Sequence, residues 1–189
     1  MVELLTVKCS WKSLNRRGLV RLMAAAVCCL LLMASLRAEA RRIERLRLEP
    51  VTMAEMSALL GQGDALHGAL TKQDDEQTEV VLRDLQIAIA KTVQASSRLK
   101  IHERSHLLKI LDSMGENLEI ARNSGSDERR ERLAEVFNML ANLVRIYAVE
   151  PRFKIFFCSR DKMTWVQTKP RGVYPFPEMG ERDCALRAP

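Results

Sequence analysis

The stretch LLKILDSMGENLEIA, residues 107–121, decides the fold class of this chain. Its apolar residues recur at alternating steps of four and three, a spacing that places side chains on one face of an α-helix. The positions that form this stripe are Leu107, Leu111, Met114, Leu118 and Ala121. The stretch therefore predicts an amphipathic helix that buries one face against other helices.

The next segment along the chain predicts another helix. The residues Asn123-Ser-Gly-Ser126 end the first pattern and offer Ser126 as the next N-cap, with Asp127 and Glu128 in the first turn. Pro151 is expected to stop this helix because proline cannot continue it. Its apolar stripe consists of Leu133, Val136, Phe137, Leu140, Leu143, Val144 and Tyr147.

Two further helices are predicted upstream. Thr52-Met-Ala-Glu55 has the form of a capping box, and a helix should run from there to about Leu70, although Gly61 and Gly63 weaken its middle. A second should begin near Asp74 or Asp75, whose carboxylates suit a helix N-terminus. Its stripe is Val81, Leu82, Leu85, Ala88, Ile89 and Thr92. We therefore expect an all-α, antiparallel up-and-down four-helix bundle over residues 52–150.

The N-terminus has the pattern of a secretory signal over residues 1–40. An unbroken apolar run from Leu22 to Leu36 follows a basic segment and precedes Arg37-Ala38-Glu39-Ala40, so cleavage is expected after Ala40. An uncleaved membrane anchor is the alternative. Arg16-Arg17 resembles a twin-arginine signal, but the general secretory route is favoured. We expect a periplasmic or extracellular protein in which residues 41–51 form a linker and membrane contact is made only by an uncleaved leader.

Charge argues against nucleic acid as a partner. The whole chain has a net charge of +6, but removal of residues 1–40 leaves 24 basic and 22 acidic side chains. The high pI is mostly a property of the leader, and no basic stripe that could follow phosphates remains. Residues 151–189 have 8 basic and 4 acidic side chains, so the tail forms a distinct basic module of the same domain.

The helical body shows no motif typical of catalysis. It has no glycine-rich phosphate loop and no His-Glu-x-x-His motif, so we expect a protein that is not an enzyme. His102 and His106 share a helix face, the minimal geometry for two metal ligands, but a solvated helix end is the favoured interpretation. Partial burial explains His67. Core packing explains Met53, Met56, Met114 and Met139.

The tail, residues 151–189, has a different pattern. Phe153, Ile155 and Phe157 alternate with Phe156 on the opposite face, which predicts a strand. Residues 165–168 predict a second short strand, and residues 159–162 connect the two. Because a two-stranded hairpin is marginal alone, it should pack on the helices. A proline-rich, irregular finish follows.

The tail resembles a bacterial family of exported helical domains that is catalogued as a domain of unknown function. That family often accompanies copper and silver efflux adaptor proteins. The resemblance covers about residues 54–187, and its specific part is the last thirty or so. It is carried by Cys158, Trp165, Gln167, Tyr174-Pro175-Phe176 and Cys184.

The resemblance implies an envelope protein that binds Cu(I) or Ag(I), with a metal-efflux adaptor or another envelope protein as partner. This sequence departs from the family pattern at the methionine positions, because Ser159-Arg160 stands where the family has Pro-Met after the first cysteine. Glu178 takes a glycine position, and Glu181 stands where the family has methionine. The nearest methionines are Met163 and Met179.

Three interpretations of Cys158 and Cys184 remain open. An oxidising compartment favours a structural disulfide between them. Alternatively, the two thiolates bind Cu(I) or Ag(I) together with Met163 or Met179. In the third, they are independent buried thiols. Without a metal the chain would be a structural or protein-interaction module, and the residues expected to pack the tail or bind a partner are Trp165, Gln167, Tyr174, Pro175 and Phe176.

Overall fold

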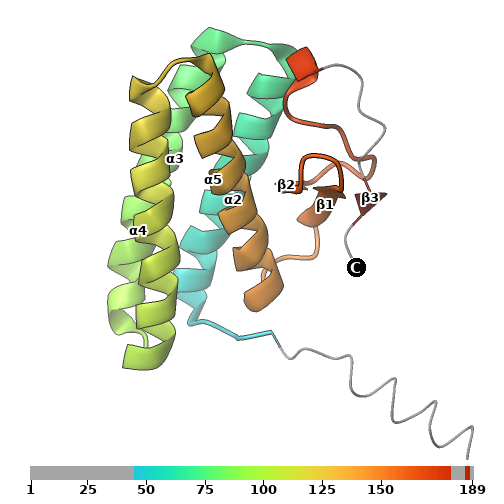
Figure 1. Ribbon diagram of the computed structural model, residues 1–189. Helices are drawn as coiled ribbons and strands as arrows, with labels where there is room; N and C mark the ends of the chain where they lie inside the picture. The colour runs from blue at the N-terminus through green and yellow to red at the C-terminus, as the bar shows by residue number, and fades with distance from the viewer. Residues whose placement is uncertain (1–44, 180–185, 188–189) are drawn as a thin grey trace, which may run out of the picture. The chain divides into compact units, whose positions relative to one another are not determined.

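The computed structural model describes residues 45–179 and 186–187, so the expected leader, Glu181 and Cys184 lie outside the described residues. Four long helices come first, followed by a small sheet (Figure 1). The helices are α2 (Pro50–Lys72), α3 (Asp75–Ala95), α4 (Ile101–Asn123) and α5 (Ser126–Ile146). Short 3-10 turns are η1 (Ser96–Arg98) and η2 (Pro177–Met179), and the strands are β1 (Lys154–Cys158), β2 (Met163–Gln167) and β3 (Leu186–Arg187).

The predicted apolar stripes form the interior. All five stripe residues of α4 have no exposed surface, and the six predicted for α3 are buried. The α5 stripe from Leu133 to Tyr147 is buried as well. Each helix contacts the next along the chain, and α2 also contacts α5. The stripe predictions are therefore confirmed, and the described residues are mostly helical with a small antiparallel sheet.

The helix starts differ from the predictions at two of three caps. Asp74 caps α3 as expected, because its carboxylate accepts a hydrogen bond from the Gln77 amide at 2.9 Å. The Thr52–Glu55 capping box was wrong: α2 begins at Pro50, whose fixed φ suits a first turn. The Thr52 hydroxyl donates instead to the Ala95 carbonyl oxygen at 3.1 Å. Ser126 is the first residue of α5, and Gly125 takes the cap position.

The end of α5 also departs from the prediction. The helix stops at Ile146 rather than continuing to Pro151, because the chain there pairs with the segment before α2. Leu46 donates its amide to the Ile146 carbonyl at 2.8 Å and accepts from the Ala148 amide at 2.9 Å. Part of the expected linker is thus hydrogen-bonded to the end of the last helix.

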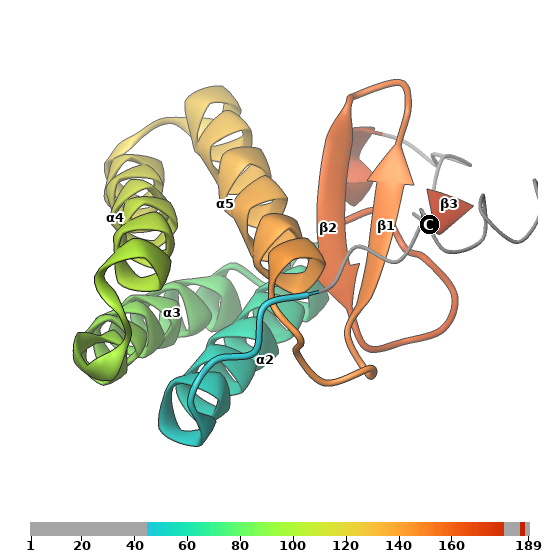
Figure 2. The same ribbon diagram turned by 90° about the horizontal axis from the view of Figure 1, so that it is seen from below.

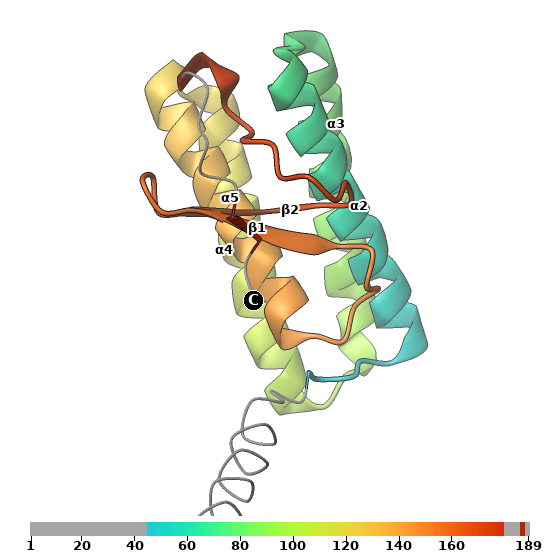
Figure 3. The ribbon, with the colours of Figure 1, turned by 90° about the vertical axis from the view of Figure 1, so that its right-hand side faces the viewer.

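The sheet is antiparallel and has the order β2-β1-β3. β1 and β2 form the predicted hairpin, although β2 begins two residues early, at Met163. β3 was not predicted, and it pairs with β1 through Phe157↔Leu186 and Phe156↔Arg187. β2 contacts both α5 and α2, so the sheet lies beside these two helices (Figures 2 and 3).

Gly63 of α2 packs closely against the Leu140 side chain of α5. A Cβ built there would lie 2.6 Å from Leu140 Cδ1, whereas one at Gly61 would meet nothing within 4 Å. Gly61 and Gly63 therefore differ in their surroundings, because a side chain at position 63 would require Leu140 of α5 to shift and one at position 61 would not. No helix among the described residues is both long and apolar enough to span a lipid bilayer.

Candidate functional site

A row of aromatic rings fixes the tail to the helices. The Phe156 ring stacks on Trp165 with centroids 6.0 Å apart, and Tyr174 meets Trp165 edge-on at 5.8 Å. Phe176 contacts Tyr174 at 6.0 Å and reaches Phe137 of α5 at 6.4 Å. Edge-on and stacked pairs at these separations are favourable beyond the area they bury. The row joins β1, β2 and the proline-rich segment to α5.

Gln167 at the end of β2 satisfies four polar groups of the tail. It is fully buried. Its side-chain oxygen accepts from Trp165 Nε1 at 3.0 Å and from the Val173 amide at 3.1 Å. Its amide nitrogen donates to the Lys169 carbonyl at 3.1 Å and to the Arg171 carbonyl at 2.6 Å. One side chain thus holds the turn that follows β2.

Two polar residues on α2 hold the same turn from the helical side. The Asp64 carboxylate accepts from the Thr168 amide at 3.0 Å and from the Thr168 hydroxyl at 2.7 Å. His67 lies one helical turn further on, with Nε2 2.7 Å from the Val173 carbonyl oxygen. Because a carbonyl oxygen only accepts, Nε2 must carry a proton. We refer to Asp64, His67 and Gln167 together as the tail anchor.

Burial shapes the charge state of His67. Desolvation lowers the pKa of its imidazole below the ordinary value, while the hydrogen bond to Val173 and the Asp64 carboxylate act in the opposite direction. Lys169 lowers the pKa further. His67 is only 5% exposed and meets the edge of Phe137, with centroids 6.5 Å apart. The anchor is therefore built to hold a neutral imidazole.

The sulfur residues of the tail are only partly described. Cys158 and Met163 are direct partners across β1 and β2, and both are buried. Cys158 Sγ lies 3.7 Å from Asp161 Oδ2. The Met179 backbone ends η2, but its side chain and Cys184 are outside what the structure describes.

The five residues expected to pack the tail or bind a partner are all buried, which favours packing. Trp165 and Gln167 have no exposed surface, and Tyr174, Pro175 and Phe176 are buried beside them. Sequence reasoning missed Asp64 and explained His67 by burial alone. The available signal was weak, because a lone aspartate and histidine three residues apart on a helix rarely indicate a tail contact.

The histidine pair at the start of α4 is exposed. His102 and His106 both face solvent, and His106 Nδ1 lies 3.4 Å from the Tyr147 hydroxyl. Within residues 45–179 and 186–187, no three or more His, Cys, Asp or Glu side chains are grouped so that they could hold a metal ion.

Comparison with known proteins gives no match, whether to a family model, a curated protein or a solved structure. The resemblance described above therefore rests on the tail residues themselves.

Proposed function

We propose that this chain is a non-enzymatic exported protein whose helical domain binds another envelope protein. Its tail is a structural element closed by a Cys158–Cys184 disulfide. The observation that supports this proposal is the burial of the tail's aromatic and polar side chains. The aromatic rings and Gln167 are used inside the domain, so the larger part of the surface left for a partner belongs to the helices.

The finer fold in this proposal is an antiparallel up-and-down four-helix bundle. Its support is the order of contacts, since α2–α3, α3–α4 and α4–α5 are neighbours and α2 contacts α5. The connections are short, at residues 73–74, 96–100 and 124–125. Short links between long helices favour antiparallel neighbours.

Strand pairing supports the cysteine pairing. Leu186 is the partner of Phe157, which precedes Cys158 in β1, and Cys184 comes two residues before Leu186 in the sequence. Two residues span at most about 7 Å, and a disulfide needs Cα atoms roughly 5.5 Å apart. Cys184 can therefore reach Cys158 without any change in the β1–β3 pairing.

The second candidate is a site for Cu(I) or Ag(I) formed by Cys158 and Met163 with Cys184 and Met179. The observation that favours it is the direct pairing of Cys158 with Met163, which places a thioether beside a sulfur ligand. Soft sulfur donors select such cations. This function requires reduced cysteines, because a disulfide offers no thiolate.

Two measurements on the exported chain decide between these candidates. Intact mass after alkylation of the unreduced protein should lack a label at Cys158 and Cys184 and fall about 2 Da below the reduced mass. Titration of the reduced chain with Cu(I) against a competing chelator measures the affinity of the metal site that the second candidate requires. Tight binding that is lost in a Cys158→Ser, Cys184→Ser variant would support the metal site and count against the structural tail.

The binding function is tested in the native host. A photo-cross-linking amino acid is placed at Ile87 of α3, Ile101 of α4 or Glu135 of α5, all of which are exposed. Illumination should yield a discrete protein adduct from at least one position, and mass spectrometry identifies it. A cross-linker at the buried residue Leu111 is the control and should give no adduct. If the three exposed positions also give no adduct, the proposed binding function is wrong.

A further inference from the structure

A groove with an apolar floor and acidic walls runs past the first half of α5. It consists of two hollows, one of about 680 Å³ between α3 and α5 and one of about 720 Å³ between α5 and the β1–β2 turn. Arg130 and Phe176 line both, so the hollows meet at these two residues. We call the pair the α5 groove.

The floor of the α5 groove is apolar. Leu70 and Leu133 lie in the first hollow, Met163 lies in the second, and Phe176 contributes to both. Leu133, Met163 and Phe176 are nearly covered by the protein itself, so each offers only a small surface. A bound segment would therefore make a few apolar contacts with side chains that are already fixed in place by the fold.

The walls of the groove are acidic. The first hollow is lined by three acidic and two basic side chains, and the second by five acidic and two basic ones, with Arg130 common to both. The groove thus has a formal charge of −5, in a chain that is +2 once residues 1–40 are removed. Such a local excess of negative charge raises the concentration of cationic groups near this surface.

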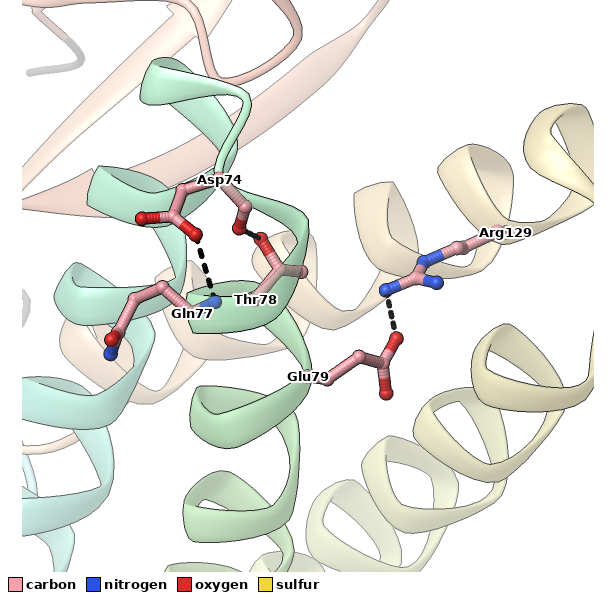
Figure 4. A network of polar contacts seen from close by, with 5 residues as sticks. All are labelled: Asp74, Gln77, Thr78, Glu79 and Arg129. Atoms are coloured by element: carbon pink, nitrogen blue, oxygen red, sulfur yellow. Dashed lines mark hydrogen bonds and ion pairs between the residues drawn. The ribbon is translucent and has the colours of Figure 1, made fainter.

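The arginines of the groove are already engaged. Arg129 forms an ion pair with Glu79 at 2.5 Å, which joins α5 to α3 beside the start of α3 (Figure 4). Arg130 pairs with Asp127 at 3.3 Å. These pairs neutralise the two arginines within the protein, and the carboxylates that remain outnumber Lys162, the basic side chain of the second hollow that is in none of these ion pairs.

Glu131 and Glu135 supply the clearest part of that unbalanced charge. Both are exposed, line the second hollow and lie four residues apart on α5. Like charges at this spacing destabilise a helix. Among the described residues, neither has an ion-pair partner. A cationic segment bound in the groove would remove this repulsion.

We propose that the α5 groove docks a lysine- or arginine-rich segment of a partner protein, with apolar side chains of that segment on the floor. This rests on the proposed function and names the chemistry of its partner. Cationic groups would face Glu131 and Glu135, and intervening apolar side chains would face Met163 and Phe176. The occupant is extended or helical polypeptide, because the two hollows share Arg130 and Phe176 and one segment could contact both.

The test measures fluorescence anisotropy of a labelled peptide of alternating lysine and leucine, about 12 residues long, against the intact chain. Binding should saturate and weaken strongly as salt rises, because screening shortens the range of exposed charges to about 10 Å at 0.1 M. A Glu131→Gln, Glu135→Gln variant should bind about fivefold more weakly or worse. Its thermal midpoint should be unchanged or higher, which separates lost binding from lost folding.

A matched variant controls for net charge. Glu55→Gln, Asp84→Asn makes the same charge change at a hollow between α2 and α3, and its affinity should stay within about twofold of the parent chain. Equal weakening by both variants would overturn the proposal, as would an unchanged affinity in the Glu131, Glu135 variant or the absence of any peptide binding.

Other occupants give distinct results that also overturn it. Spermidine that displaces the peptide at an equal concentration of positive charge would indicate a small polycation. Self-association in sedimentation velocity that is lost in the Glu131→Gln, Glu135→Gln variant would indicate a second copy of the chain. A host adduct from Ile87 or Ile101 without peptide binding would refute the groove and leave the proposed function standing.

Discussion

Replacing Gln167 by methionine should be among the most destabilising changes in the tail. The side chain keeps its length, but four hydrogen bonds are lost, to Trp165, Lys169, Arg171 and Val173. Trp165 is fully buried, so its indole N–H would bear the full penalty of an unpaired group, about 1–3 kcal/mol. Lys169, Arg171 and Val173 are partly or fully exposed, so water replaces part of their loss. We expect a total of about 2–4 kcal/mol.

Urea unfolding followed by both tryptophan fluorescence and far-ultraviolet circular dichroism measures this effect. If the tail detaches before the helices unfold, the fluorescence change will precede the helical change. Gln94→Met is the matched control, because Gln94 is exposed on α3 and its replacement should shift the free energy of unfolding by less than about 0.5 kcal/mol.

A double-mutant cycle isolates the indole contact. In a Trp165→Phe background the donor is absent, so Gln167→Met should cost about 1 kcal/mol less than in the parent chain. A Gln167→Met variant that is as stable as the Gln94→Met control would refute the role assigned to this side chain.

Three further predictions concern α2. Because burial lowers the pKa of His67, the unfolded chain binds a proton at a higher pH than the folded chain does. The contribution of His67 to the free energy of unfolding should therefore be fully present above about pH 6.5 and fall at lower pH. His67→Gln should flatten this pH dependence in unfolding curves measured from about pH 7 to 4. Gly61→Ala should stabilise by about 0.5–1 kcal/mol, whereas Gly63→Ala should be destabilising because its Cβ meets Leu140, and equal thermal midpoints would contradict this contrast. Asp64→Ala removes two hydrogen bonds to the tail and should lower stability by about 1–3 kcal/mol, and a hydrogen-exchange measurement that shows no loss of protection at residues 168–173 would count against it.

The helical stripes could be predicted because their information is local. Leu107, Leu111 and Met114 lie within two helical turns, so spacing alone places them on one face. The start of α2 could not be predicted in this way. The Thr52 hydroxyl does not cap the helix, because it donates to the carbonyl of Ala95, 43 residues away. Local rules for capping fail where a distant acceptor competes for the same side chain.

The α2 side of the tail anchor, Asp64 and His67, was beyond sequence reasoning for the same physical reason, whereas Gln167 was among the residues expected to pack the tail. Asp64 and Thr168 are 104 residues apart, and nothing in either neighbourhood indicates the other. The hairpin itself was predictable from the alternation around Phe156. β3 was missed because two residues, Leu186 and Arg187, show no period of their own and gain their conformation from β1.

The distance in sequence between the two sides of the tail anchor has a consequence for the order in which the chain folds. The helix pairs α2–α3 and α4–α5 bring together residues that are close in sequence, so they can form early. His67 must wait for Val173, 106 residues later. During vectorial emergence from a ribosome, the face of α2 that holds Asp64 and His67 stays uncovered until Thr168 and Val173 arrive. We expect that interval to be when the chain is most exposed to chaperones and proteases.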